Sequence, residues 1–220
     1  MSSYSVERIS YEGEPVVVVD GFHPDPDALR AQAARAGFKR LSPHYPGVQA
    51  PADPAHLAPV GDTLTEIIHD VFGVQAGVSV VQCTFSLVTV PDAELAPIQR
   101  LPHVDTTDPG RIALLHYLSG DDMGGTAFYR HRATGLDVLT PETFPRYRDA
   151  VQNEGLPPAH YMRGSDARFE MIHCVEARPN RAVLYRSRLL HSGMIPEGAG
   201  FSAEPESGRL TLNTFFQSKD

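Results

Sequence analysis

From residue 78 onward the chain consists of short runs rich in β-branched and aromatic residues, separated by Gly, Pro and Asp. Such runs predict β-strands. They cover residues 78–90, 111–118, 126–131, 169–175, 181–185 and 209–216. Because helices do not alternate regularly with these strands, the pattern favours an antiparallel sandwich or jelly roll over a doubly wound sheet.

The part before residue 78 predicts one strand and two helices. A buried strand is expected at residues 16–20, followed by a helix at 27–36 that begins with the cap Asp25 and Pro26. Thr63 and Glu66 have the spacing of a capping box ahead of a second helix.

Two further segments complete the prediction of secondary structure. The Pro-rich residues 41–60 predict a loop, and residues 141–151 predict a third helix after the cap Thr140. We therefore expect a mainly β fold with flanking helices.

The length of 220 residues fits one compact domain, so residues 1–220 are predicted to form a single domain. In this arrangement residues 1–75 pack on a core at 78–216. The hydrophobic fraction of 41% and the charged fraction of 21% are those of a folded globular protein.

Charge and hydropathy exclude several classes of partner. The net charge of -8 argues against nucleic-acid binding, which needs clustered Lys and Arg. The apolar run at residues 16–19 is far too short to span a membrane, and the polar start at 1–10 lacks a signal core. A cytoplasmic location is therefore expected. Cys83 and Cys174 are isolated, so neither a disulfide framework nor a zinc knuckle is predicted.

A candidate metal site comes from His103 and Asp105, two residues apart in a segment expected to be extended. Side chains at i and i+2 of a strand point to the same side, so an imidazole and a carboxylate converge there. His191 follows an apolar run and is the candidate third ligand, with His116 and His173 as alternatives.

The same spacing occurs at His23 and Asp25, but these residues lie between prolines at a helix start. There the side chains are directed to turns and caps, so this pair is rejected. Two imidazoles and one carboxylate suit iron(II) with open coordination positions, and zinc-dependent hydrolysis is the competing use of such a set.

Five segments, in this order and strand context, resemble the iron(II)/2-oxoglutarate-dependent dioxygenases, and most closely their prolyl-hydroxylase-like branch. They are HVD at 103–105, LLHYLS at 114–119, GGTAF at 124–128, PNRAVLY at 179–185, and His191 followed by GRLTL at 208–212. The resemblance covers residues 78–216 and, more loosely, the strand and helix that begin at residue 16. It implies a double-stranded β-helix, a jelly roll related to the cupin barrel.

The resemblance also implies cofactors and roles. By this resemblance, iron(II) would be held by His103, Asp105 and His191, and 2-oxoglutarate and dioxygen would be co-substrates. In this family a basic residue of the last strand pairs with the far carboxylate of 2-oxoglutarate, often with a hydroxyl two residues later. Arg209 and Thr211 occupy these places, and Tyr117 is a further candidate contact to 2-oxoglutarate. Because Asp105 supplies a carboxylate ligand, hydroxylation or a related C–H oxidation is favoured over halogenation.

Two features depart from the family pattern. His191 and Arg209 are 18 positions apart (209 minus 191), a longer gap than usual, so residues 194–207 are expected to form an inserted loop over the site. Arg181 stands where a glycine is common in the preceding turn.

Arg130, Arg132 and Arg188 belong to the one basic concentration in this acidic chain and are candidates for binding a carboxylate-bearing substrate. A small molecule, an amino acid and a peptidyl side chain all remain open as substrates, and the sequence predicts no oligomeric state. Two other functions also remain: a cupin-like metal enzyme that does not use 2-oxoglutarate, and a non-catalytic binding module on the same fold.

Overall fold

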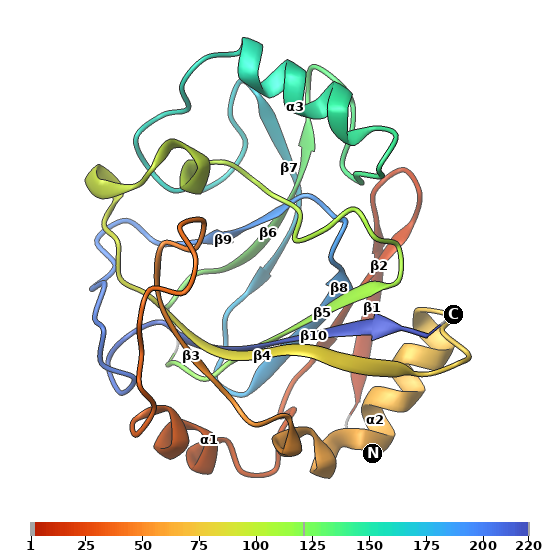
Figure 1. Ribbon diagram of the computed structural model, residues 1–220, viewed down its shortest axis with the longest axis vertical. Coiled ribbons are helices and arrows are strands. Elements are labelled where there is room, and N and C mark those ends of the chain that lie inside the picture. Colours follow the sequence, from red (N-terminus) through yellow and green to blue (C-terminus); the bar gives the residue numbers. More distant parts are fainter. Residues whose placement is uncertain (1–2, 121, 220) are drawn as a thin grey trace.

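The computed structural model describes residues 3–120 and 122–219, which form two antiparallel sheets with helices outside them (Figure 1). The larger sheet has seven strands in the order β1-β2-β8-β5-β10-β4-β3. Their bounds are β1 Tyr4–Ile9, β2 Glu14–Val19, β3 Gly47–Pro51, β4 Val78–Val88, β5 Arg111–Tyr117, β8 Arg181–Arg186 and β10 Leu210–Ser218. The ends of the predicted domain, at residues 1 and 220, lie outside the described residues.

The smaller sheet has the order β7-β6-β9, with β6 Gly125–His131, β7 Phe169–Glu176 and β9 His191–Met194. The two sheets face each other across an apolar cluster. Tyr117 and Tyr185 reach it from the larger sheet and Phe128 from the smaller one, and all three are buried. The predicted mainly β, antiparallel class is therefore confirmed.

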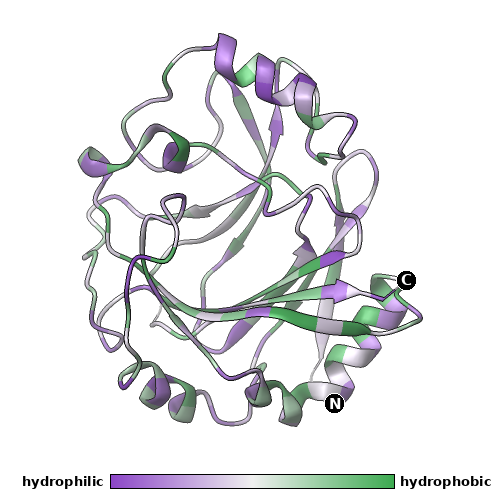
Figure 2. Cartoon of the chain, in the orientation of Figure 1, coloured by the Kyte–Doolittle hydropathy of each residue, from purple (hydrophilic) through white to green (hydrophobic). Residues whose placement is uncertain are grey.

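Helices and short helical turns lie outside the two sheets. They are α1 Pro26–Ala33, α2 Gly61–Glu66, the π-helical turn η2 Ile67–Val71 and α3 Phe144–Asn153, with short 3-10 turns at η1 Pro54–Val60, η3 Asp92–Glu94 and η4 Pro97–Arg100. Leu29 and Ala33 of α1 pack with Phe85 and Leu87 of β4. Hydrophilic and hydrophobic residues are interspersed along the helices in Figure 2, as expected for helices with one buried side. Within residues 3–120 and 122–219, no helix is long and apolar enough to cross a membrane.

The local structure before residue 78 agrees with the sequence prediction at one helix cap and differs from it at three other features. Asp25 caps α1 as predicted, because its side chain accepts a hydrogen bond from the backbone N–H of Ala28 at 2.9 Å. The capping box at Thr63 is wrong, since η1 leads into α2 at Gly61 without a side-chain cap. Strand β1 was missed because most of its side chains are exposed, and β3 lies inside the Pro-rich stretch predicted as a loop.

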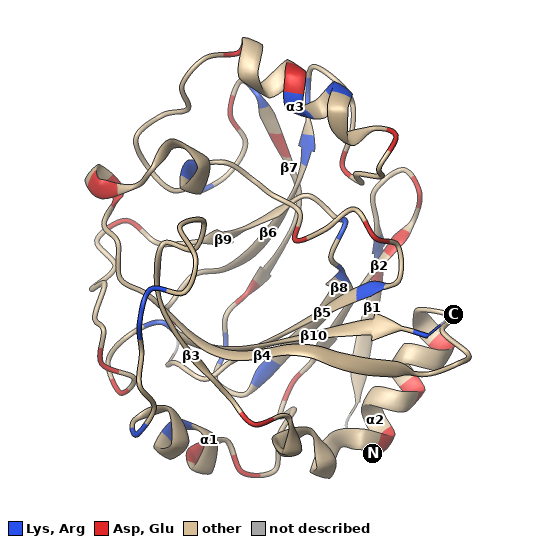
Figure 3. Ribbon diagram, viewed as in Figure 1, with Lys and Arg blue, Asp and Glu red and all other residues tan. Residues whose placement is uncertain are grey.

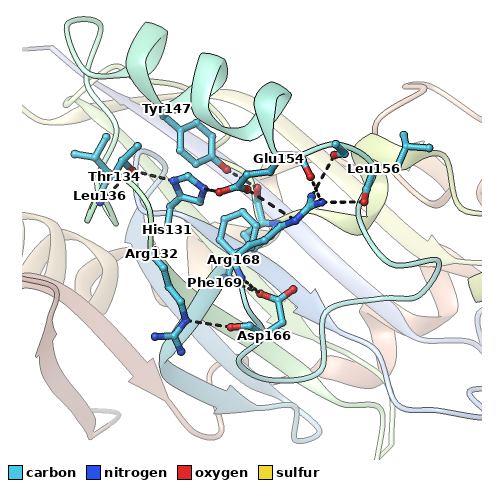
Figure 4. Close-up of polar contacts among 12 residues, drawn as sticks. His131, Arg132, Thr134, Leu136, Tyr147, Glu154, Leu156, Asp166, Arg168 and Phe169 are labelled. Atoms are coloured by element: carbon cyan, nitrogen blue, oxygen red, sulfur yellow. Dashed lines mark hydrogen bonds and ion pairs between the residues drawn. The ribbon is translucent and has the colours of Figure 1, made fainter.

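Helix α3 lies on the outer face of the smaller sheet and is anchored through a buried histidine (Figure 4). The ring nitrogens of His131 lie 3.0 Å from Glu154 Oε1 and 2.9 Å from Thr134 Oγ1. Tyr147, on α3, donates a hydrogen bond from its hydroxyl to the carbonyl of Pro102 at 3.3 Å. The helix therefore supports the segment that carries His103.

The turn before β8 explains the departure at Arg181. Asn180, not residue 181, adopts the left-handed conformation, with φ of 59°, and Asn tolerates this region better than most residues. The Asn180 side chain binds both the N–H and the C=O of His23 at 2.9 Å. Arg181 is instead in the strand and forms a two-point ion pair with Asp20.

His116 gives this turn a predictable dependence on pH. Burial lowers its pKa to about 3, against the opposing effect of the hydrogen bond to Asn180. His116 therefore stays neutral in the folded protein at pH values at which it is protonated in the unfolded chain, that is, below its ordinary pKa near 6.5. Stability is present in full above that pH and falls as the pH drops toward 3. At pH 5 the loss from this one group is about 2 kcal/mol.

The test compares the free energy of unfolding at pH 7 and pH 5 in the wild type and in His116→Gln, which keeps a donor for Asn180. We expect the variant to lose about 2 kcal/mol less on acidification. The exposed His160→Gln serves as control. Equal losses in wild type and His116→Gln would show that another group is responsible.

Candidate metal centre

The segment with His103 and Asp105 is extended but is not part of a continuous strand. His103 and His191 form an isolated antiparallel bridge, with both backbone hydrogen bonds at 2.8 Å. The N–H of Asp105 donates to the carbonyl of Ser187 at 3.0 Å. Val104, between the two, packs against the apolar cluster beneath α3. The contacts with the β8–β9 connection thus keep this segment extended, so that the side chains of His103 and Asp105 point to one side and that of Val104 to the other.

These contacts bring His103, Asp105 and His191 together, with one potential ligand atom from each within 4.8 Å of the others. Asp105 lies between the histidines: its Oδ1 is 3.9 Å from His103 Nε2 and its Oδ2 is 3.8 Å from His191 Nε2. The two imidazole rings are 4.5 Å apart, centre to centre. The other candidate third ligands lie elsewhere, because His116 bonds to Asn180 on the outer side of the larger sheet and His173 pairs with Glu7.

The protonation states suit metal binding. Burial lowers the pKa of His191 to about 4, and its Nδ1 lies 2.8 Å from the carbonyl of Leu189, to which it donates. That contact leaves Nε2 of the neutral ring unprotonated and able to bind a metal. Desolvation and the neighbouring His191 ring also lower the pKa of His103, although its side chain is the more exposed of the two. Both imidazoles are therefore neutral near pH 7.

The site is closed on one side and open on the other. The side chain of His191 is only 6% exposed, whereas those of Asp105 and His103 are 21% and 54% exposed. The rings of Tyr185 and Phe128 lie 4.8 and 6.4 Å from that of His191 and form the closed wall. A ligand therefore reaches this group of side chains from the side of His103.

Arg209 lies just before β10, further along the same interior. Its guanidinium donates to the carbonyls of Met123 and Gly125 at 2.9 and 2.8 Å. Gly193 lies two residues after His191 on β9, and a Cβ added there would be 4.0 Å from Arg209 Nη2. The absent side chain leaves room between the histidine and the guanidinium. Residues of the segment after β9, among them Ile195 and Phe201, line a hollow with Arg209.

Two tyrosines discussed here, Tyr45 and Tyr117, lie near this guanidinium, and Tyr45 was not predicted. Burial raises the pKa of Tyr45 to about 12, against the opposing charge of Arg209. Its buried hydroxyl is protonated and lies beside Ser86, and among the described residues it has no hydrogen bond of normal geometry. The Pro-rich stretch around Tyr45 carries no periodic pattern, so no signal in the sequence marked it. An orphaned donor beside a guanidinium is what an added carboxylate would satisfy.

Tyr117 and Thr211 are paired across β5 and β10, as cross-strand partners. Both are buried, and the Tyr117 ring lies 5.8 Å from the Arg209 guanidinium. The Tyr117 hydroxyl is 2.7 Å from Thr126 Oγ1, so it already has a protein partner. Both predicted residues thus lie near Arg209.

The three arginines predicted at the substrate have other partners. Arg130 forms two hydrogen bonds with Asp137, at 3.0 and 2.8 Å, and Arg188 two with Glu14, at 3.1 and 2.5 Å. Arg132 donates to the backbone carbonyl of Asp166. Each is thus held by a partner, and the structure does not gather them into one anion site.

The family described as "Family of unknown function (DUF6445)" matches residues 1–216. No curated protein matches the sequence at a significant level.

Solved structures of 2-oxoglutarate-dependent iron oxygenases have a similar fold. HygX from Streptomyces hygroscopicus, solved with nickel and 2-oxoglutarate, is 15% identical with a TM-score of 0.53, over 95% of this chain and 85% of HygX. The epimerase SnoN of nogalamycin biosynthesis is 14% identical with a TM-score of 0.51, over 94% and 78%. The collagen prolyl hydroxylase of Paramecium Bursaria Chlorella virus-1 is 11% identical with a TM-score of 0.50, over 95% and 98%. The chain therefore has the fold of this superfamily, as the sequence motifs predicted.

Proposed function

Because the chain belongs to the DUF6445 family, whose function is unknown, we propose an activity from its site: an iron(II)- and 2-oxoglutarate-dependent oxygenase that hydroxylates a small molecule, amino acid or peptidyl side chain. The observation that carries the proposal is the arrangement along β9. His191 joins His103 and Asp105, and two residues later Gly193 opens onto Arg209. A metal site and a carboxylate site thus share one interior.

The side chains present fit both cofactors. His103, Asp105 and His191 offer two neutral nitrogens and one carboxylate, a donor set that suits iron(II) and leaves positions for other ligands. Arg209 and the orphaned hydroxyl of Tyr45 would hold the far carboxylate of 2-oxoglutarate. Iron(II) with 2-oxoglutarate and dioxygen supplies oxidative C–H chemistry, with succinate and carbon dioxide as the products of the co-substrate.

The protein's own part in the reaction is to position and to shield. The contact with Leu189 O fixes the His191 ring, and Tyr185 and Phe128 keep water from its buried side. Since Asp105 fills a ligand position, hydroxylation is favoured over halogenation. The two sheets are proposed to form a double-stranded β-helix within a single domain, and the segment 194–207 to close over the co-substrate end.

The neighbours suggest a substrate class. A structure of HygX has hygromycin B bound beside nickel and 2-oxoglutarate, and SnoN acts in nogalamycin biosynthesis. Both support a small-molecule substrate more than a protein one. A cupin-like enzyme without 2-oxoglutarate remains the second candidate, because the metal triad alone is common to both.

The proposal is tested with the purified protein loaded with iron(II) without oxygen. Addition of 2-oxoglutarate should produce the visible charge-transfer band of its iron chelate, and admission of oxygen should then release succinate, slowly even without substrate. Iron binding without the band would favour the cupin-like alternative. Absence of iron binding would end the proposal.

A further inference from the structure

A row of uncharged polar side chains lies on the face of the larger sheet that looks toward the smaller sheet. Its members, which we name the polar floor, are Gln49 of β3, Thr84 and Ser86 of β4, and Asn213 of β10. The register pairs Gln49 with Ser86 and Thr84 with Asn213. The alternating residues of β4, Phe85 and Leu87, pack against α1 on the opposite face.

The hydrogen bonds within the polar floor are incomplete. Ser86 is fully buried, and its Oγ accepts from Gln49 Nε2 at 3.1 Å and from Asn213 Nδ2 at 3.3 Å. By contrast, Thr84 Oγ1 and Asn213 Oδ1 are buried and have no partner within the described parts of the chain. Orphaned polar atoms reduce stability, so their presence in adjacent positions calls for an explanation. A ligand that donates a hydrogen bond to Asn213 Oδ1 and forms another with Thr84 Oγ1 would satisfy both atoms.

The polar floor runs from the co-substrate end, where Ser86 pairs with Thr211, toward the metal group, where its orphaned atoms lie on Thr84 and Asn213. Asn213 follows Arg209 by four residues on β10, roughly 13 Å in an extended strand. Its partner on β5 is Leu115, and the next inward position, Ala113, pairs with Tyr185, whose ring contacts His191. A molecule bonded to Thr84 and Asn213 would therefore lie near the metal group, whereas the Ser86 end of the floor adjoins the carboxylate site.

The chemistry of the row favours a neutral ligand. Strands β3, β4 and β10 contain no charged residue, which leaves them uniformly tan in Figure 3. An ion there would lose its water without gaining a counter-charge. We propose that the polar floor binds a neutral hydrogen-bonding group of the substrate, a hydroxyl or a carboxamide. This inference rests on the proposed function, and it assigns Thr84 and Asn213 to substrate specificity.

The test pairs two identical substitutions on opposite faces of the sheet. Thr84→Val removes an orphaned hydroxyl from the floor. Thr214→Val is the control, because Thr214 is equally buried but lies on the outer face, with its Oγ1 3.5 Å from Cys83 Sγ. If the floor awaits a ligand, Thr84→Val should raise the Tm of the unliganded protein by about 2–4 °C. Thr214→Val should leave the Tm unchanged or lower it.

Binding is measured by saturation-transfer NMR with three probes of similar size: myo-inositol, which is neutral, glucosamine, which is cationic, and glucuronate, which is anionic. We expect myo-inositol to bind most tightly and Thr84→Val to bind it roughly 5–30-fold more weakly, the loss of one or two hydrogen bonds. Thr214→Val should bind it like the wild type.

Four results would overturn the inference: tighter binding of a charged probe, no myo-inositol binding at about 50 mM, unchanged myo-inositol binding in Thr84→Val, or a lowered Tm in that variant, which would mark its hydroxyl as structural. The charge-transfer band of iron and 2-oxoglutarate is recorded on the same samples. If the band is normal, any of these results overturns this inference but leaves the proposed function in place. A wild type without the band overturns the proposed function, and with it the assignment of the floor to a substrate.

Discussion

Replacement of Asp105 by alanine is expected to weaken iron(II) binding by more than about 100-fold, since even residues that only orient metal ligands contribute 10- to 100-fold. The carboxylate lies between the two imidazoles, 3.8 and 3.9 Å from their nitrogens, and is the only anionic member of the group. His191→Ala should have an equally large effect, because its buried Nε2 is held in position by the contact with Leu189. Anaerobic titration with iron(II) provides the measurement.

Controls separate ligand loss from general damage. Asp149→Ala and His69→Ala remove the same side-chain types at positions where the side chains are 60% and 53% exposed. Neither should alter iron affinity.

Burial raises the pKa of Asp105, so its removal also relieves a desolvated carboxylate, and the Tm of the Asp105→Ala apoprotein should be unchanged or slightly higher. Wild-type affinity in Asp105→Ala would remove that residue from the metal site.

The convergence of His103, Asp105 and His191 was predictable in part, because two of these residues are close in sequence. The i, i+2 relation of His103 and Asp105 holds wherever the backbone is extended, and a single bridge to His191 is enough to extend it. The third member required the family resemblance, since nothing in the local sequence distinguishes His191 from His116. The structure separates them by face: His116 lies outward against Asn180, while His191 faces Asp105.

Other features depended on contacts that sequence spacing does not encode. The sequence suggested Arg130 and Arg188 as substrate-binding residues, but they form ion pairs with Asp137 and Glu14. Glu14 is 174 positions from Arg188, so the sequence does not reveal this pair. Tyr45 reaches Arg209 from a stretch without periodicity. The polar floor escaped notice because Thr84 and Asn213 look like ordinary strand residues until the register of β4 with β10 brings them together.

Replacement of Arg209 by alanine should reduce 2-oxoglutarate affinity by roughly tens to thousands of fold. The guanidinium is the cation adjoining the space beside Gly193, and Tyr45 alone would offer the far carboxylate only a neutral donor. Truncation of one partner in a desolvated charge pair costs about 2–5 kcal/mol, and about 1.4 kcal/mol corresponds to tenfold in affinity. Iron affinity should persist, because Arg209 is not a ligand. The 2-oxoglutarate affinity of Arg209→Lys should lie between those of the wild type and Arg209→Ala, because lysine keeps the charge but loses the two-pronged geometry.

The substitution also removes two hydrogen bonds to the carbonyls of Met123 and Gly125, so stability must be measured alongside affinity. Arg168→Ala is the matched control: that arginine is half-buried beneath α3 and donates to the carbonyls of Glu154 and Leu156 (Figure 4). Both variants should lose Tm, but only Arg209→Ala should lose the 2-oxoglutarate charge-transfer band at concentrations that saturate the wild type. If both variants titrate like the wild type, the carboxylate of 2-oxoglutarate is held elsewhere, and the cupin-like alternative becomes the better account of this site.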